Sequence, residues 1–400
     1  MAQFIISPAA LQGNAQILHE VGQRSGAHML IALKACSTTN ALAHLRPYAA
    51  GCCASGLYEA RLGRDHVGGE VAVYSPAYRP DELTELLSFA HHIDFNSVPQ
   101  WLRYREQCLA APRVQSGELR LGLRINPCHS TGHTPLYDPC IPGSRLGLPQ
   151  EQLTPDALVG INGLHFHTLC EQGAGELIET FRAFETQFAE LLASEQISYL
   201  NLGGGHWITK PDYDREALIE LIIEIRERYQ IEVYLEPGEA WCIHTGVLRA
   251  RVLDIFDSLG YRHAILDISA SAHMPDVLEM PYRPELFSIH PSDAVGSEQQ
   301  PALALPNETY QLAGEAGEKE HTYRLGAPTC LAGDVIGDYS FNHELQLGDE
   351  LIFDDMSHYT IVKTTHFNGV PHPDIAILQE DGSVKVVKQF GYEDFLHRLG

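Results

Sequence analysis

Basic residues are scarce in this chain. Its 400 residues include 27 Lys and Arg against 52 Asp and Glu, which gives a formal net charge of −25. Such a charge repels the phosphates of nucleic acids and of anionic membranes, and it suits a cationic small molecule. We therefore expect no nucleic-acid partner.

Long hydrophobic runs are missing as well. No stretch reaches the roughly 18 uninterrupted apolar residues of a membrane-spanning helix. The first residues, MAQFIISPAALQ, lack the basic segment that precedes the apolar core of a secretory signal. These absences predict a cytoplasmic protein with no membrane partner.

Cysteine spacing excludes two further classes of protein. The nine cysteines are an odd number and form no pair of C-x-x-C motifs, so neither a disulfide framework nor a structural zinc site is favoured. We expect reduced thiols, packed mostly as small hydrophobic side chains, and no metal. The glycine run at 203–205 is not G-x-G-x-x-G, so dinucleotide binding is not indicated.

Along the first 245 residues, short apolar runs alternate with amphipathic stretches of helical spacing such as 175–195 and 214–229. The apolar runs are MLIALK, GCCAS, EVAVYS, HHIDFNS, ELRLGLRIN, GINGLHFH, ISYLNLGGG and EVYLEPG. Alternation of strands and helices with this number of strands predicts a (β/α)8 barrel of the TIM type, in the α/β class.

Beyond residue 246 the sequence changes to strand-like runs with few helical signals. These runs are GVLRARVLDIF, HAILDIS, ETYQLAGE, GDELIFDD and IAILQEDGSVKVV, and residues 292–308 have the composition of a surface loop. We expect a barrel domain over 26–245 and a mostly β domain over 246–400. The N-terminal segment 1–25 is expected to join the β domain.

Polar residues follow the predicted barrel strands, at the end where active sites of such barrels lie. They are Lys34, Ser55, Glu59, Arg124, His165, His167, Gly203, Gly204, Gly205, Glu236 and Glu239. A lysine among apolar walls has a lowered pKa, and its neutral amine can attack an aldehyde to form a Schiff base. Residues without Cβ allow backbone N–H groups to close on a phosphate. Taken singly, Lys34 can also be a snorkelling side chain.

The motifs IALK, HFH, LNLGGG, YLEPG, GAPTCLAGD and DMSHYT together resemble the fold-type III pyridoxal-phosphate decarboxylases, which include ornithine and diaminopimelate decarboxylases. The resemblance spans nearly the whole chain. The longer motifs LRINPCHS, YDPCIPGSRLG, HFHTLCEQ, EPGEAW and PTCLAGDVIGDY are most similar to the carboxynorspermidine/carboxyspermidine decarboxylases.

The resemblance implies a cofactor, pyridoxal 5′-phosphate, and roles at matching positions. Lys34 would hold the cofactor, His167 would stack on its ring, Gly203, Gly204, Gly205 and Tyr359 would contact its phosphate, Glu236 would face its ring nitrogen, and Cys330 would enter the active site from the other subunit of a homodimer. Cys330 is the expected proton donor, with Lys34 as the alternative. We place Arg124 near the cofactor or, alternatively, in a structural ion pair.

One position departs from the family pattern. Ornithine and diaminopimelate decarboxylases generally carry an arginine after Glu-Pro-Gly, where this sequence has Glu239. A pocket for a cationic carboxylated triamine needs anions, for which Glu239, Asp334 and Asp276 are the candidates. Solvated surface carboxylates remain the alternative for Glu239 and Asp334. Arg283 fits such a pocket less easily.

The expected reaction is decarboxylation of carboxynorspermidine to norspermidine, or of carboxyspermidine to spermidine, with release of CO2. The alternatives are a meso-diaminopimelate decarboxylase, a non-catalytic pyridoxal-phosphate-binding scaffold and a racemase on the related fold. The sequence does not decide between the two triamine precursors, and it leaves His165, Ser55 and Glu59 without a role.

Overall fold

The computed structural model describes residues 1–132, 134–280, 282–290 and 299–400, so residues 292–298 of the predicted surface loop lie outside it. The chain forms two compact units. One is built from residues 12–241, and the other combines residues 1–11 with 242–400. We call them the barrel domain and the sheet domain.

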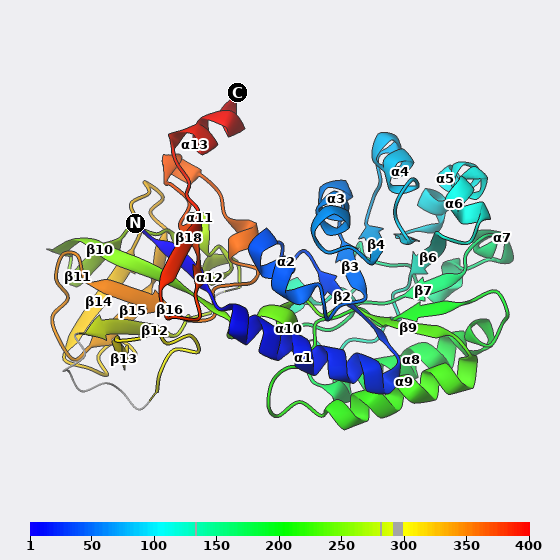
Figure 1. Ribbon diagram of the computed structural model, residues 1–400, viewed down its shortest axis with the longest axis horizontal. Coiled ribbons are helices and arrows are strands. Elements are labelled where there is room, and N and C mark those ends of the chain that lie inside the picture. Colours follow the sequence, from blue (N-terminus) through cyan, green and yellow to red (C-terminus); the bar gives the residue numbers. More distant parts are fainter. Residues whose placement is uncertain (133, 281, 291–298) are drawn as a thin grey trace. The chain divides into compact units, whose positions relative to one another are not determined.

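The barrel domain contains a closed barrel of eight parallel strands, which confirms the predicted (β/α)8 fold (Figure 1). The strands are β2 (His28–Ala32), β3 (Gly51–Ala54), β4 (Glu70–Ser75), β5 (His92–Phe95), β6 (Arg120–Arg124), β7 (Gly163–His165), β8 (Tyr199–Asn201) and β9 (Glu232–Leu235). Each predicted apolar run contains one of them. β2 pairs with both β3 and β9, and this pairing closes the barrel.

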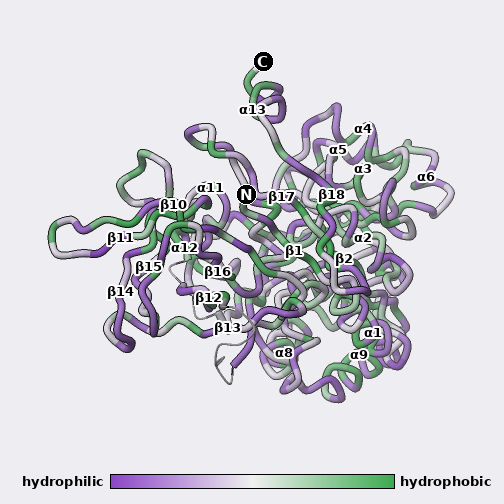
Figure 2. Tube along the Cα trace, turned by 60° about the vertical axis from the view of Figure 1, so that its left-hand side comes forward, coloured by the Kyte–Doolittle hydropathy of each residue, from purple (hydrophilic) through white to green (hydrophobic). Residues whose placement is uncertain are grey.

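Amphipathic helices cover the outside of the barrel (Figure 1). They are α1 (Pro8–Ser25), α2 (Thr39–Leu45), α3 (Leu57–His66), α4 (Pro80–Leu86), α5 (Val98–Ala110), α6 (Pro112–Gln115), α7 (Pro155–Leu158), α8 (Ala174–Leu192), α9 (Arg215–Tyr229) and α10 (Glu239–Cys242), with 3-10 turns at Pro135–Tyr137 and Gln150–Gln152. In α8, Leu177, Phe181, Phe184 and Phe188 are buried at helical spacing. Figure 2 shows hydrophobic and hydrophilic residues alternating along α1, α8 and α9.

The sheet domain is mostly β, as predicted. Its strands are β1 (Gln3–Ile6), β10 (Gly246–Ser258), β11 (Tyr261–Leu266), β12 (Leu286–His290), β13 (Thr309–Leu312), β14 (His321–Gly326), β15 (Val335–Phe341), β16 (Glu350–Phe353), β17 (Asp374–Leu378) and β18 (Val384–Lys388). The main sheet has the order β13-β12-β16-β10-β1-β17-β18, and β11, β14 and β15 continue from β10. The sequence prediction did not include β1, β12, β14 or β15.

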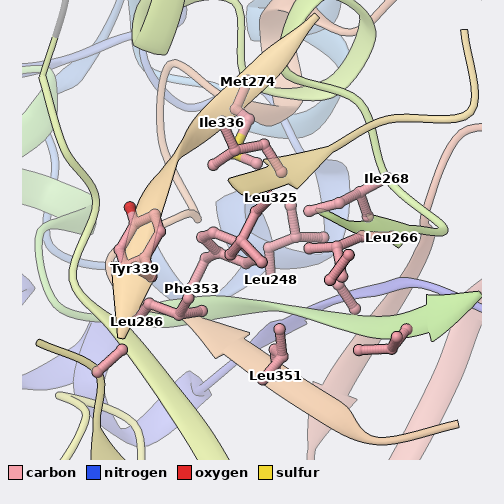
Figure 3. Close-up of a cluster of buried hydrophobic side chains, with 14 of the residues drawn as sticks. Leu248, Leu266, Ile268, Met274, Leu286, Leu325, Ile336, Tyr339, Leu351 and Phe353 are labelled. Carbon is pink, nitrogen blue, oxygen red and sulfur yellow. The ribbon is translucent and has the colours of Figure 1, made fainter. Parts of the chain in front are cut away.

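Short helices complete the sheet domain: α11 (Ala270–His273), α12 (Asp276–Glu279) and α13 (Tyr392–Leu399), with 3-10 turns at Ile361–Lys363 and Phe367–Gly369. Its core brings together side chains from distant parts of the chain, among them Leu248, Leu286, Leu325, Tyr339 and Phe353 (Figure 3). Burial of these apolar side chains away from water stabilises the sheet.

Two sequence predictions concern the whole described chain. Within the described ranges, no helix is long and apolar enough to cross a membrane. All nine cysteines are free thiols.

Candidate active site

Lys34 and His167 meet at the C-terminal ends of the barrel strands. Lys34 follows β2, His167 follows β7, and Lys34 Nζ lies 3.3 Å from His167 Nε2. Although part of the Lys34 side chain is exposed, desolvation of the ammonium lowers its pKa, and the nearby Arg124 charge acts in the same direction. Burial also holds the pKa of His167 well below the usual value for histidine, again helped by the charges of Lys34 and Arg124.

The backbone fixes the tautomer of His167. The N–H of Gly204 donates to His167 Nδ1 over 2.9 Å, so Nδ1 carries a lone pair and the proton of the neutral ring is on Nε2. Nε2–H then faces Lys34 Nζ, which can accept this proton only as a neutral amine. The contact geometry and the lowered pKa of Lys34 therefore agree on a nucleophilic amine.

Glu236 follows β9, and its carboxylate is hydrogen-bonded by Asn201 of the neighbouring strand β8. Asn201 Nδ2 donates to Glu236 Oε1 over 2.7 Å, and Asn201 Oδ1 accepts the N–H of Gly203 over 2.9 Å. The backbone N–H of Glu236 donates to the carbonyl oxygen of Gly203 over 2.7 Å. The carboxylate and the glycine turn are thus positioned by the same asparagine.

The three glycines after β8 are required by close backbone approaches. A Cβ on Gly204 would lie 2.0 Å from the carbonyl oxygen of Glu236, and one on Gly205 would lie 1.9 Å from that of Leu169. Gly203 and Gly205 also have positive φ values of 70° and 85°. Since the N–H groups of Gly203 and Gly204 donate to Asn201 and His167, they position these side chains.

Arg124, at the end of β6, lies beside the same residues. Its Nη2 donates to the carbonyl oxygen of His167 over 3.0 Å, and its guanidinium lies 4.4 Å from the centre of the Tyr74 ring. Arg124 is buried, and this hydrogen bond fixes the backbone of His167.

The other predicted residues of the barrel domain, Ser55, Glu59 and Glu239, lie at or near the first turns of helices α3 and α10. Glu59 accepts the N–H of Ser55 over 2.6 Å at the beginning of α3, which accounts for both residues structurally. Glu239 is half-buried at the first position of α10, directly after the Glu236-Pro-Gly turn.

Cys330 and Asp334 belong to the loop between β14 and β15 of the sheet domain. Cys330 is exposed, and its N–H donates to Asn368 Oδ1 over 2.9 Å. Asp334 is buried, and its carboxylate accepts the hydroxyls of Ser269 (2.6 Å), Ser271 (2.8 Å) and Thr329 (2.5 Å) and the N–H of Ser271 (3.0 Å). These bonds favour a role for Asp334 in holding the loop that carries Cys330.

The remaining predicted residues of the sheet domain are also engaged. Lys363 Nζ donates to Asp276 Oδ1 over 2.5 Å, and Arg283 donates to the carbonyl oxygen of Gly314 over 2.6 Å while stacking on Tyr339. Arg283 therefore contacts protein, in line with its poor fit to a pocket for a cationic substrate. Tyr359 is half-buried, edge-on to His358 with 6.0 Å between ring centres.

Sequence reasoning missed two residues around Glu236. Asn201 lies inside the strand motif YLNL, and Asp94 lies inside the strand motif HHIDFNS. A polar residue within an apolar strand motif is the feature that indicates each of them. His165, which the sequence left unassigned, lies 3.6 Å from Glu236 and 3.1 Å from Asp94.

Comparison with known proteins agrees with this site. A family model described as "Pyridoxal-dependent decarboxylase, C-terminal sheet domain" matches residues 57–357. The carboxyaminopropylagmatine decarboxylase of Synechocystis sp. is 42% identical over 398 residues, covering 99% of this chain and 95% of that protein. The carboxynorspermidine/carboxyspermidine decarboxylase of Campylobacter jejuni is 38% identical over 392 residues, covering 98% and 96%.

A solved structure extends the likeness to three dimensions. The crystal structure of carboxynorspermidine decarboxylase from Campylobacter jejuni, complexed with norspermidine, matches with a TM-score of 0.83 at 36% identity. The match covers 100% of this chain and 99% of that one. The chain belongs to the pyridoxal-dependent decarboxylase family. It is a pyridoxal-phosphate-dependent carboxy-lyase.

The barrel residues fit this cofactor. Lys34, His167 and Glu236 follow β2, β7 and β9 at the same end of the barrel. The lysine has a lowered pKa and suits an aldehyde, the neutral imidazole suits an aromatic face, and the carboxylate suits a protonated ring nitrogen. The backbone contacts of Gly204 and Gly205 leave no room for side chains at the turn.

Proposed function

We propose that this enzyme decarboxylates carboxynorspermidine or carboxyspermidine, giving norspermidine or spermidine and CO2. The similarity to carboxynorspermidine decarboxylase over the full length of both chains carries this proposal. The net charge of −25 supports a cationic substrate.

In this proposal each residue has a defined task. Bound pyridoxal phosphate supplies an electron sink for the electron pair left when the carboxylate departs as CO2. Lys34 Nζ would hold the cofactor, His167 would contact its ring, and the carboxylate of Glu236 would favour a protonated ring nitrogen. A proton from Cys330 Sγ, or from Lys34 Nζ, then replaces CO2 at Cα. Arg124 keeps His167 in place.

Contacts to the phosphate and to the substrate amines complete the proposal. Gly205 and Tyr359 would bind the phosphate, whereas Gly203 and Gly204 position Asn201 and His167. Glu239 and Asp276 would attract the distal amines of the substrate, with Asp334 acting on the same loop as Cys330.

The assembly and the location belong to the same proposal. We place the enzyme in the cytoplasm, where its nine free thiols would remain reduced. The enzyme would act as a homodimer in which Cys330 reaches the active site of the partner subunit. We expect a barrel domain and a sheet domain to be needed together for activity.

A second substrate has its own support. The relative with 42% identity is a carboxyaminopropylagmatine decarboxylase, whose name indicates a guanidinium at the distal end of the substrate. Glu239 and Asp276 would suit a guanidinium as well as an ammonium, because carboxylates accept hydrogen bonds from both.

One assay distinguishes the candidates. The purified holoenzyme is incubated separately with carboxynorspermidine, carboxyspermidine, carboxyaminopropylagmatine and meso-diaminopimelate, and CO2 and the amine product are measured. Preference for either triamine supports the proposal, and preference for the agmatine derivative selects the second substrate. Preference for diaminopimelate would reject both. Cofactor binding without any CO2 would indicate a scaffold, and exchange of the α-proton without CO2 would indicate a racemase.

A further inference from the structure

His165 lies between two carboxylates inside the barrel. It ends β7 and is only 1% exposed. Its Nδ1 is 3.1 Å from Asp94 Oδ2, and its Nε2 is 3.6 Å from Glu236 Oε2. Neither ring nitrogen has a well-aligned hydrogen bond, so the ring is held at ion-pair distances from both acids.

The Asp94 side of this arrangement is rigid. Tyr199 OH donates to Asp94 Oδ1 over 2.7 Å. Two glycines make room for the pair: a Cβ on Gly122 would lie 2.0 Å from Asp94 Oδ1, and a Cβ on Gly163 would lie 1.9 Å from the Tyr199 ring. The barrel is therefore shaped around Asp94 and Tyr199.

The Glu236 side is oriented from two directions. Asn201 occupies Oε1, and His165 faces Oε2. Burial alone would raise the pKa of Asp94, but contact with His165 and the hydrogen bond from Tyr199 overcome it and lower this pKa. Asp94 is thus ionised, and the imidazole of His165 lies between this buried anion and the half-buried carboxylate of Glu236.

Other groups around His165 do not replace this imidazole. The polar and titratable neighbours on the surrounding strand ends are Lys34, Cys53, Tyr74, Arg124, His167, Tyr199 and Asn201. Of these, Lys34 has a lowered pKa, and Arg124 is directed to the carbonyl oxygen of His167. The imidazole of His165 is the group in direct contact with both carboxylates.

We propose that His165 is a positioning residue that, as an imidazolium shared by Asp94 and Glu236, keeps Glu236 ionised toward the ring nitrogen of the cofactor. The inference rests on the proposed role of Glu236. Without the imidazolium, each acid keeps one hydrogen bond, from Tyr199 to Asp94 and from Asn201 to Glu236. Because glutamate is the weaker acid of the two, we assign the proton that replaces the missing positive charge to Glu236.

The test follows the ring nitrogen itself. Wild type and His165→Phe are reconstituted with 15N-labelled pyridoxal phosphate, and the ring-nitrogen chemical shift is recorded against pH. We expect the variant to lose the ring-nitrogen proton at a pH lower by about one unit or more, equivalent to at least a tenfold change in the protonation equilibrium. An unchanged titration in His165→Phe would overturn the proposal.

His92→Phe is the matched control. His92 is also a buried barrel histidine that stacks on Tyr199 and helps to lower the pKa of Asp94, but its Nε2 contacts Arg120 and Glu70. Damage to the Asp94 and Tyr199 side would affect both variants, whereas loss of the contact with Glu236 affects His165→Phe alone. Equal shifts in the two variants would also overturn the proposal.

A double variant tests the reason for the effect. In Asp94→Asn/His165→Phe the neighbouring negative charge is gone, so Glu236 can ionise again and the ring-nitrogen titration should move back toward wild type. No recovery would contradict the charge argument. If His165→Phe does not bind the cofactor, His165→Gln takes its place in the ring-nitrogen titration. The 15N chemical shifts of the His165 imidazole are then also measured in the wild-type protein. A neutral His165 imidazole at pH 7 would overturn the proposal.

The proposed function can fail separately. Absence of CO2 from every substrate would reject the function while the ring-nitrogen titration still reports on His165. Normal turnover with unaltered titration in His165→Phe would reject only the inference.

Discussion

The backbone N–H of Gly204 donates to Nδ1 of His167, and His167 Nε2 faces Lys34 Nζ at 3.3 Å. One peptide group of the glycine turn therefore decides which nitrogen of the imidazole carries the proton. Through that proton it favours the neutral, nucleophilic form of the lysine.

Lys34 should capture pyridoxal phosphate at lower pH than an ordinary lysine. Its folded-state pKa is lowered from 10.5, so the neutral fraction is larger at every pH below that value. We expect the capture rate of the cofactor-free enzyme to reach half its maximum below pH 10.5. Nα-acetyl-lysine is the control amine, and a half-maximum at or above its own would contradict the assignment.

Lys34→Ala should abolish both covalent cofactor and nearly all turnover. Borohydride fixation of the cofactor followed by peptide mapping identifies the attachment site in wild type. Attachment to Lys210 or Lys363 would show that another lysine holds the cofactor.

Gly204→Ala should destabilise the barrel domain and weaken cofactor binding. Its Cβ would lie 2.0 Å from the carbonyl oxygen of Glu236, and the required backbone shift should cost about 1–3 kcal/mol. Gly13→Ala is the control, because Gly13 lies in α1 with no atom within 4 Å of the new Cβ, and it should be neutral or stabilising by about 0.5–1 kcal/mol. Denaturant unfolding measures both; equal stability of the two variants would be unexpected.

Glu236→Gln should retain the cofactor but slow decarboxylation. The amide can keep the hydrogen bond with Asn201, while it no longer favours a positive charge on the ring nitrogen. Loss of one charged contact of about 1.5–3 kcal/mol lowers kcat roughly tenfold to a hundredfold. Single-turnover kinetics would measure it, and wild-type kcat in the variant would rule out this role.

Much of the barrel site was predictable because its residues follow strands. Lys34, Arg124, His167 and Glu236 each end an apolar run, and strand ends converge when a parallel barrel closes. Asp94 and Asn201 are not apparent from the sequence because their importance depends on partners 35 to 105 residues away, across the barrel interior. Neither the sequence spacing nor the apolar pattern carries that information.

The sheet domain was less predictable for a related reason. β1 precedes the barrel in sequence, so the short apolar run at Gln3–Ile6 does not by itself indicate a strand that pairs with β10 and β17. β14 and β15 carry many polar residues, which weakened the apolar pattern that identified β10 and β16. The hydroxyl partners of Asp334 include Ser269 and Ser271, more than 60 residues away, so the sequence does not indicate these contacts.

Asp334→Asn should reduce stability and change its acid dependence. Burial would raise the pKa of Asp334, but hydrogen bonds from Ser269, Thr329 and Ser271 outweigh it, so the folded-state pKa lies below 3.8. A lowered pKa contributes stability above the unfolded-state value, and this contribution is lost as pH falls through the folded-state value. We expect the variant to be less stable at neutral pH by about 1–3 kcal/mol, with the difference shrinking in acid. Unfolding at several pH values tests this, and a pure KM effect would instead support direct substrate contact.

Mixing inactive subunits tests the proposed dimer. Lys34→Ala and Cys330→Ala chains, exchanged with each other, should regain partial activity if each site takes Lys34 from one subunit and Cys330 from the other. Each variant exchanged with itself is the control. No recovery after verified exchange would place both residues in one chain or remove Cys330 from the reaction.

The position of β1 affects how the sheet domain assembles and which truncated chains can fold. β1 pairs in parallel with β17 and antiparallel with β10, so during synthesis it waits for partners that begin at residues 246 and 374. Pairing of this range makes for a high contact order and slow final assembly of the sheet. A fragment starting at residue 242 would lack a central strand and expose two unpaired strand edges, which favours aggregation. The sheet domain is therefore expected to express well only from chains that keep their first six residues.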